Sequence, residues 1–324
     1  MVAKAGIFPV LLYGIVALAN SAFVHFVDWR AHQNPRERLL WDEELPRSGV
    51  VILGDSVFAS SYVDSANQTF SFLLQQRTGE KVFNGALDGA DPPDFLNAAK
   101  LLTSGGMRGA TVVLDIFPNR FLQFRYPENP SGNQARRFAR LVGEGTVSSI
   151  FAEIRRPLVI LDPDVLMNCL IRKKFFGVDP YRNRTWDKDG DLARRRFESF
   201  QQQIEFDGFR GLEWLDALNG LLKNSDNKLV LFISPVNGRL IDAYSSKEYA
   251  PRYHSLFARS HERLVRYLDR QGIPYIDGSK RFDTEDFIDL VHVNANGEQR
   301  IADLIDRYLT DGRAISASAP KHTQ

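Results

Sequence analysis

The sequence predicts an α/β fold, a three-layer α/β/α sandwich built around a mainly parallel sheet. Short apolar runs rich in β-branched residues alternate with helical segments along most of the chain, and this alternation is typical of parallel sheets with helices on both faces. Polar residues follow several of these apolar runs directly, at the position where open α/β sheets place their sites. The hydrophobic content of 44% and charged content of 25% are those of an ordinary globular chain.

The first half of the predicted domain reads strand, helix, strand, helix, strand. The first strand is a continuous apolar run stopped by Gly54, as expected for a strand buried on both faces. Gly79 ends the first helix, and the second helix opens on Asp91-Pro92-Pro93, because proline is tolerated in a first turn. The five expected elements are residues 50–53, 69–77, 82–83, 91–104 and 111–116.

The second half repeats the alternation after a long interruption. Residues 229–233 and 273–276 are expected strands, a long helix runs through 254–268 between them, and a final helix covers 295–309. Residues 121–228 separate the third and fourth strands, and we expect a mainly helical insertion at the carboxyl edge of the sheet. The α/β domain therefore spans 49–311, and the small polar tail 312–324 is expected to be disordered.

An apolar segment precedes this domain. Residues 5–27 contain no Asp, Glu, Lys or Arg, and about 20 such residues suffice to cross a bilayer as a helix. We expect residues 1–28 to form a transmembrane anchor and residues 29–48 to form a linker. A cleaved signal peptide ending at the small residues around Ala17 and Ala19 is the alternative, and a buried helix is a third reading. The first two place the domain outside the cytoplasm, for example in a periplasm.

Composition excludes several classes of protein. The formal net charge is +1, so there is no basic excess of the kind that nucleic-acid binding requires. Cys169 is the only cysteine, which rules out a disulfide framework or a cysteine-based metal cluster. His254 and His261 lie on one expected helix without acidic or cysteine partners at ligand spacing, so we expect no metal site and no cofactor.

Candidate catalytic residues stand at the ends of the expected strands. Ser56 follows the first strand, and Asp289 and His292 stand three residues apart, just before the last helix. A serine hydroxyl needs a base to become a nucleophile, a histidine can serve near neutral pH, and a carboxylate orients the imidazole. These types predict acyl-transfer chemistry at Ser56, His292 and Asp289.

Three further polar residues are expected to have structural roles. Asp55 and Asn84 are expected to bond the turns that follow the first two strands. Asp115, inside the third strand, is expected to be a hydrogen-bonded structural acid.

Four motifs together resemble the SGNH, or GDSL-type, hydrolase superfamily. They are Gly54-Asp55-Ser56, Asn84 with Gly89 five residues later, Asn119 after the third strand, and Asp289-x-x-His292 with its trailing Asn294 and Gly297. The resemblance covers about residues 49–310 outside the insertion. It implies Ser56 as nucleophile, His292 as base and Asp289 as its acid.

The same resemblance implies an oxyanion hole. Its donors would be the backbone N–H groups of Ser56 and Gly89 and the side-chain amide of Asn119. The third motif departs from the family pattern, because Phe117 and Arg120 stand where glycine and aspartate are usual. Phe117 would narrow the pocket in which an acyl or leaving group binds.

The expected function is a serine-dependent ester hydrolase or O-acyltransferase acting on an acylated cell-envelope carbohydrate. The anchor together with Gly-Asp-Ser and Asp-x-x-His loosely resembles the SGNH proteins that work beside multi-pass membrane-bound O-acyltransferases, as in alginate or cellulose acetylation and teichoic-acid D-alanylation. A lipase, esterase or thioesterase acting on small acyl esters is one alternative. A binding or scaffold module without activity is the other, because the third motif is altered.

Overall fold

The computed structural model describes the single residue Ile15 and the ranges 47–60, 62–63, 66–86, 90, 92–117, 190–201 and 212–311. The expected anchor, apart from Ile15, lies outside these residues, as do most of the expected linker and insertion and the tail 312–324. Among the described residues, no helix combines the length and apolar character that crossing a membrane requires.

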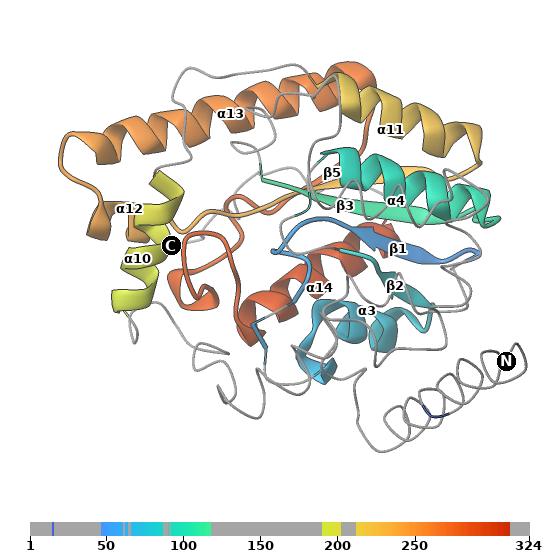
Figure 1. Cartoon of the computed structure of the whole chain (residues 1–324), viewed down its shortest axis with the longest axis horizontal. Coiled ribbons are helices and arrows are strands. Elements are labelled where there is room, and N and C mark those ends of the chain that lie inside the picture. The colour runs from blue at the N-terminus through green and yellow to red at the C-terminus, as the bar shows by residue number, and fades with distance from the viewer. Residues whose placement is uncertain are drawn as a thin grey trace, which may run out of the picture.

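Within the described residues, five parallel strands form one sheet, in the order β2-β1-β3-β4-β5 (Figure 1). The expected parallel α/β sheet is confirmed, and each strand lies within about two residues of the expected position. In the central register Leu53 pairs with Leu114, and Ile116 pairs with Ile233. The carboxyl ends of β1, β3 and β4 therefore lie at one edge of the sheet. The strands are β1 Val50–Leu53, β2 Val82–Asn84, β3 Thr111–Ile116, β4 Lys228–Ile233 and β5 Tyr275–Asp277.

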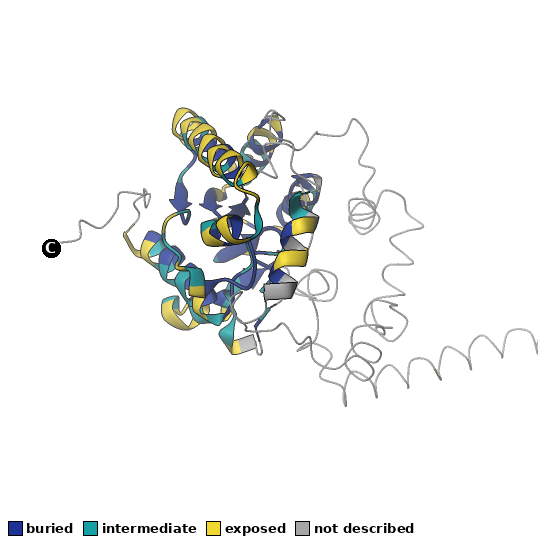
Figure 2. Ribbon diagram, turned by 90° about the vertical axis from the view of Figure 1, so that its left-hand side faces the viewer, coloured by how far each residue is buried: buried dark blue, intermediate teal, exposed yellow. Residues whose placement is uncertain are grey.

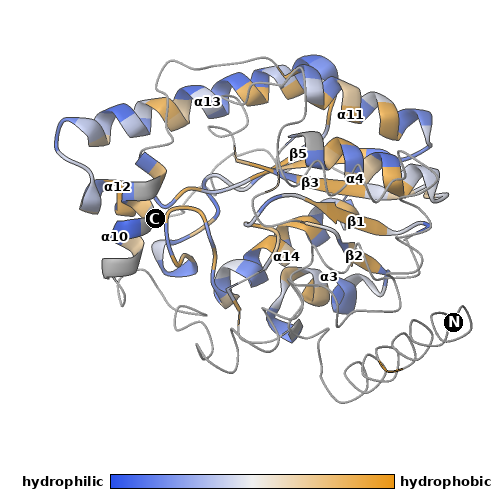
Figure 3. Ribbon diagram, viewed as in Figure 1, coloured by the Kyte–Doolittle hydropathy of each residue, from blue (hydrophilic) through white to orange (hydrophobic). Residues whose placement is uncertain are grey.

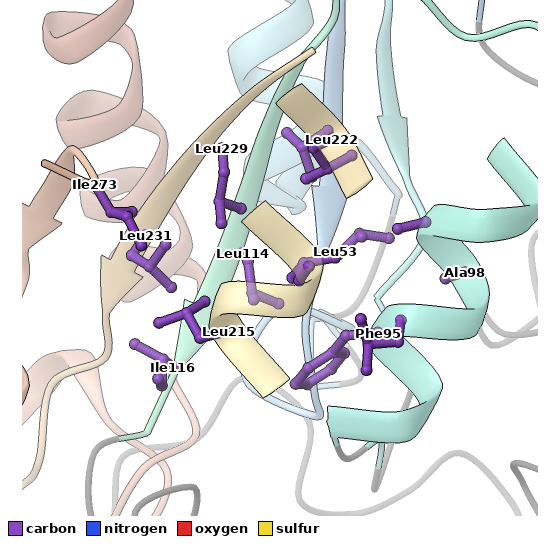
Figure 4. Close-up of a cluster of buried hydrophobic side chains, with 14 of the residues drawn as sticks. Leu53, Phe95, Ala98, Leu114, Ile116, Leu215, Leu222, Leu229, Leu231 and Ile273 are labelled. Atoms are coloured by element: carbon purple, nitrogen blue, oxygen red, sulfur yellow. The ribbon is translucent and has the colours of Figure 1, made fainter. Parts of the chain in front are cut away.

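Helices cover both faces of the sheet, and alternate residues of each strand divide between them. Val51 and Leu53 pack in the cluster formed by α4, α11 and α13, whereas Val50 and Ile52 pack in the cluster formed by α3 and α14. Figure 4 shows the first cluster, with Leu53 beside α4 and α11. The helices are α3 Phe70–Thr78, α4 Pro92–Ser104, α11 Glu213–Asn224, α13 Tyr249–Gln271 and α14 Ala295–Asp311.

The burial of both strand faces explains the unbroken apolar runs in the sequence. Every residue of β1 is buried, and the strands are enclosed by helices whose outer surfaces are exposed (Figure 2). The strands are mainly hydrophobic, while the helices carry mixed surfaces (Figure 3). This is the pattern of a parallel sheet covered on both sides.

The segment between β3 and β4 contributes two described helices. The helix α11 lies within the segment 121–228, and it packs against α4 and β4 as part of the β3-to-β4 crossover. The helix α10, Gly190–Gln201, packs beside α12, Gly238–Tyr244, in a third apolar cluster. That cluster includes Leu290, so α10 and α12 support the loop that carries Asp289 and His292.

Two helical glycines allow a matched test of packing. A Cβ added at Gly220 in α11 would meet no atom within 4 Å, whereas a Cβ added at Gly297 in α14 would lie 2.4 Å from the Cβ of Val293 and 2.7 Å from the carbonyl oxygen of Asp286. We expect Gly220→Ala to raise the free energy of unfolding by up to about 1 kcal/mol, since alanine is the better helix former.

We expect Gly297→Ala to lower the free energy of unfolding by about 1–3 kcal/mol, because the extra methyl overpacks a closed contact. Urea unfolding monitored by circular dichroism measures both changes. Shifts of the same sign in the two variants would contradict the packing of α14 described above.

Candidate active site

The turn after β1 requires a glycine because a carboxylate fills the neighbouring space. A Cβ on Gly54 would lie 1.7 Å from Oδ1 of Asp115. The same oxygen accepts a hydrogen bond from the backbone N–H of Asp55 at 2.8 Å. Gly54 therefore lets β3 approach the start of the turn closely enough to hold it.

The side chain of Asp55 closes the turn, as the sequence predicts. Its Oδ1 accepts a hydrogen bond from the N–H of Val57 at 2.9 Å, and its carbonyl oxygen accepts one from the N–H of Ala59 at 3.0 Å. Asp55 is 3% exposed. Its carboxylate is thus used inside the turn, and Ser56 is the polar side chain that the turn offers to the site. We call residues Asp55–Ser60 the nucleophile turn, after the role that the sequence predicts for Ser56.

Asp115 is the structural acid that the sequence predicts. It is fully buried in β3, and besides Asp55 it accepts a hydrogen bond from the hydroxyl of Ser234 through Oδ2 at 3.5 Å. Ser234 follows β4, so one carboxylate joins the ends of three neighbouring strands. Buried polar groups are normally paired in this way because an unpaired one is costly.

Ser56, His292 and Asp289 form one hydrogen-bonded chain. Nε2 of His292 lies 2.8 Å from Oγ of Ser56, and Nδ1 lies 2.8 Å from Oδ2 and 3.0 Å from Oδ1 of Asp289. The expected meeting of these three side chains is confirmed. Asp289 therefore favours the imidazole tautomer with its proton on Nδ1, in which Nε2 can accept the serine proton.

The acid of this chain is more deeply buried than the base. The side chain of Asp289 is 4% exposed and that of His292 is 16% exposed. The carboxylate also accepts hydrogen bonds through Oδ1 from the N–H groups of Val291 at 3.1 Å and His292 at 2.9 Å. The acid is thus buried and held from several directions, whereas Ser56 and His292 are both partly exposed.

Backbone bonds fix the loop that carries the acid and the base. Phe287 and Val293 form an antiparallel bridge, and the N–H of Ile288 donates to the carbonyl of His292 at 2.9 Å. From outside the loop, the N–H of Asn237 donates to the carbonyl of Leu290 at 2.9 Å. The loop between Asp289 and His292 is therefore a closed turn anchored to the segment that follows β4.

Asn294 joins this loop to α14. Its Nδ2 donates to the carbonyl of Glu285, and its Oδ1 accepts from the N–H groups of Asn296 and Gly297 at the start of the helix. This is an N-terminal helix cap, which satisfies N–H groups that have no partner within the helix. The cap explains why asparagine follows the histidine at this spacing.

Asn84 contacts the nucleophile turn, and Tyr62 contacts the histidine. Asn84, at the end of β2, donates from Nδ2 to the carbonyl of Phe58 at 3.0 Å and accepts from the N–H of Ala86, so it bonds turns as predicted. The ring of Tyr62 lies 4.6 Å from the imidazole of His292, centroid to centroid, at a tilt of 48°. Aromatic contacts of this kind stabilise a fixed ring orientation.

A second group of Ser, His and Asp lies after β5 and has a different geometry. Nε2 of His261 contacts Oδ2 of Asp277 at 2.8 Å and Oγ of Ser279 at 3.3 Å, and the Ser279 hydroxyl donates to Asp277 at 2.6 Å. Burial raises the pKa of Asp277, but the hydrogen bonds from His261 and Ser279 outweigh burial and lower that pKa below 3.8. The serine proton goes to the carboxylate, so this group anchors α13 to the turn after β5.

Two of the predicted site residues lie outside the described residues. Gly89 and Asn119, the predicted oxyanion donors, are outside them, so their role stays a prediction. His254 contacts Asp242 at 2.7 Å. Across the described ranges, no three His, Cys, Asp or Glu side chains converge as a metal site would require.

Sequence reasoning missed Tyr62 and Glu298. The contact of Tyr62 with His292 depends on how the chain bends after the nucleophile turn, and no local pattern signals it. Glu298 lies on the same helical face as Ile301, Ala302 and Ile305, all of which are buried. A carboxylate on the buried stripe of an amphipathic helix is a usable sequence signal.

Comparison with known proteins gives structural similarity only. No model of a protein family matches the sequence, and no curated protein matches it. The chain is similar to the solved structure of a GDSL-like lipase from Bacteroides thetaiotaomicron, with 12% identity, coverage of 86% of this chain and 98% of that chain, and a TM-score of 0.41. It is similar to the structure of a lipolytic protein of the G-D-S-L family from Veillonella parvula, with 10% identity, coverage of 82% of this chain and 99% of that chain, and a TM-score of 0.42. It is also similar to the structure of an extracellular lipase from Streptomyces rimosus, with 12% identity, coverage of 82% of this chain and 100% of that chain, and a TM-score of 0.39.

The role of Asp115 can be tested by removing its acceptor oxygens. We expect Asp115→Ala to lower the free energy of unfolding by about 1–3 kcal/mol, because the buried N–H of Asp55 loses its partner. Asp115→Asn keeps an oxygen in the Oδ1 position, and we expect a loss below about 1 kcal/mol. Urea unfolding of both variants measures the difference, and equal losses would show that the contact with Asp55 does not hold the turn.

Proposed function

We propose that the protein is a serine-dependent acyl-ester hydrolase of the SGNH type, with Ser56 as nucleophile. The observation that supports this most directly is the chain Ser56 Oγ–His292 Nε2 and His292 Nδ1–Asp289, with both contacts at 2.8 Å. A nucleophile, a base and an orienting acid within hydrogen-bond reach are the signature of covalent acyl transfer. The parallel sheet that places Ser56 directly after β1 supports the same assignment.

In the proposed reaction, Oγ of Ser56 attacks the carbonyl carbon of an ester while Nε2 of His292 takes the serine proton. The resulting imidazolium is stabilised by the carboxylate of Asp289, which remains ionised. His292 then protonates the leaving alcohol as the ester C–O bond breaks, and the acyl group stays on Ser56. A second hydroxyl compound, activated by the same histidine, releases the acyl group and regenerates the serine.

The acyl acceptor divides the proposal into two forms. Water as acceptor makes the enzyme an esterase, and a sugar hydroxyl makes it an O-acyltransferase. Both forms use the hydrogen-bonded chain of Ser56, His292 and Asp289, which we call the relay. Neither the fold nor the relay distinguishes between the two acceptors. We propose hydrolysis as the basic activity, and transfer to a cell-envelope carbohydrate as the biological form that the apolar residues 5–27 favour, since an anchored or exported domain would meet such substrates.

The oxyanion donors belong to the same proposal. Negative charge grows on the carbonyl oxygen during attack, and losing one fixed donor typically costs on the order of 100- to 1,000-fold in rate. We assign this role to the backbone N–H groups of Ser56 and Gly89 and to the side chain of Asn119, from the resemblance of the motifs.

Labelling with a fluorophosphonate probe tests the nucleophile. We expect the full chain to react covalently with the probe and Ser56→Ala to lose all labelling, because Nε2 of His292 is positioned to take the proton of the Ser56 hydroxyl. Ser279→Ala is the matched control: this serine also has a histidine and an aspartate beside it, yet we expect labelling to be unchanged. Gel fluorescence and mass spectrometry of the labelled peptide provide the measurement.

Two results would overturn the assignment. A folded wild-type protein that does not label would favour the scaffold alternative, and labelling at Ser279 would move the site to the turn after β5. Circular dichroism of each variant establishes that the protein is folded.

The acceptor is tested by following an acetyl group. With p-nitrophenyl acetate as donor, we expect release of p-nitrophenol that depends on Ser56 and, when oligosaccharides are added, acetylated sugar detectable by mass spectrometry. Ser56→Ala corrects for spontaneous transfer. If acetate is the only product over a wide range of sugar concentration, the transferase form is wrong and the esterase form stands.

A further inference from the structure

Glu298 is a buried carboxyl group directly behind the nucleophile turn. Glu298 is the fourth residue of α14 and is 1% exposed. Its Oε2 accepts hydrogen bonds from the N–H of Phe70 at 2.7 Å and from the hydroxyl of Ser60 at 2.9 Å. Phe70 begins α3 and Ser60 ends the nucleophile turn, so a single oxygen atom joins three elements.

We propose that Glu298 is a positioning residue for the nucleophile: its buried carboxyl group holds the Ser60 end of the nucleophile turn against α3 and against the helix that follows His292. The inference rests on the proposed function, because it assigns Glu298 to the alignment of Ser56 with His292. It adds to that function a group that touches neither substrate nor relay.

The backbone of Ser60 shows why the turn needs holding. Ser60 has φ of +51°, a left-handed conformation that non-glycine residues adopt only where the surroundings impose it. The hydrogen bond from its hydroxyl to Glu298 is such a constraint. Ser56 lies four residues earlier in the same turn, so releasing Ser60 would move the nucleophile relative to His292.

At its α14 end, the contact between Ser60 and Glu298 is close in sequence to the base, His292. The helix α14 begins at Ala295, three residues after His292, and Asn294 caps it. Glu298 therefore ties the turn of the nucleophile to the helix whose start carries the base. Ser56 and His292 lie 236 positions apart, and the contact between Ser60 and Glu298 links their two segments at a second point.

The charged groups around Glu298 are engaged elsewhere. The elements packed most closely on α14 are α3, β5, η2 (Ala66–Gln68) and η6 (Thr284–Asp286), and β4 also contacts it, with the ammonium group of Lys228 over the ring of Tyr308. Among the described residues, none of their charged side chains bonds to Glu298. Each has a partner of its own, or is exposed as Glu285 is: Arg77 pairs with Asp303, Arg300 with Asp283 and Asp286, and Asp277 with His261.

Burial without a cationic partner raises the pKa of Glu298 to about 8, although the hydrogen bonds from Phe70 and Ser60 act in the opposite direction. The carboxyl group is therefore mainly neutral at pH 7. Because the folded-state pKa lies above the ordinary value of 4.5, the stability that the neutral group provides is complete below pH 4.5 and is lost as the pH rises through about 8. The ionised carboxylate of Glu298 is solvated when the nucleophile turn opens to water, so ionisation favours opening.

The test compares the pH dependence of Ser56 reactivity in wild type, Glu298→Gln, Glu298→Ala and the control Glu262→Gln. Glu262 is also a helical glutamate, but its side chain is 65% exposed on α13. The rate constant for fluorophosphonate labelling is measured from pH 6 to 9.5. Hydrogen exchange of the peptides covering residues 55–60 is followed in the same buffers.

We expect wild type and Glu262→Gln to lose about tenfold in labelling rate between pH 7 and pH 9, since a group with a pKa near 8 is then about nine-tenths ionised. Glu298→Gln keeps a neutral acceptor and should show no such loss. Glu298→Ala removes the acceptor and should react more slowly at every pH. Exchange in residues 55–60 should rise above pH 8 beyond the intrinsic rate in wild type but not in Glu298→Gln.

Superimposable pH profiles of wild type and Glu298→Gln would overturn the inference while leaving the proposed function intact. If wild type does not label at all, the proposed function fails, and the exchange measurement then decides the inference alone. If Glu298→Ala does not fold, the comparison of wild type with Glu298→Gln still decides it. Equal exchange in those two proteins at pH 9 overturns the role of Glu298 in holding the turn.

Discussion

The hydrogen bond between Ser56 and His292 joins residues that are 236 positions apart, and it exists only because the carboxyl ends of the parallel strands share one edge of the sheet. The register of β1, β3 and β4 sets that edge. Each strand is buried on both faces, so the polar groups needed for chemistry can appear only where the strands end. The site is therefore a consequence of how the core is packed.

Buried polar contacts convert this edge into a defined geometry. Asp115 holds the start of the nucleophile turn, Asn84 holds its middle, and Glu298 holds its end. Each of these side chains is at least nine-tenths buried and comes from a different element. Since a buried polar group left unpaired is costly, each contact restricts the turn strongly. Together they leave Ser56 as the member of the turn whose side chain reaches the relay.

Much of this arrangement could be predicted from sequence because the signals are local. The apolar runs placed all five strands, Thr69 and Gly79 placed the ends of α3, and Gly54-Asp55-Ser56 with Asp289-x-x-His292 placed the relay. The contact of Tyr62 with His292 and that of Ser60 with Glu298 could not be predicted, since both depend on how distant elements dock. The short helix α12 was also missed, because its seven residues show too little periodicity to be recognised.

The two groups of Ser, His and Asp show why residue types alone do not define a site of this kind. In the group after β5, one nitrogen of His261 faces both Asp277 and Ser279, and the serine hydroxyl donates to the carboxylate. In the relay, the two nitrogens of His292 face different partners, the acid on one side and the serine on the other. Only the second arrangement can pass a proton from serine to histidine while the acid stabilises the resulting charge. Nucleophilic chemistry therefore depends on which ring nitrogen meets which oxygen, and that is set by the anchored loop between Asp289 and His292.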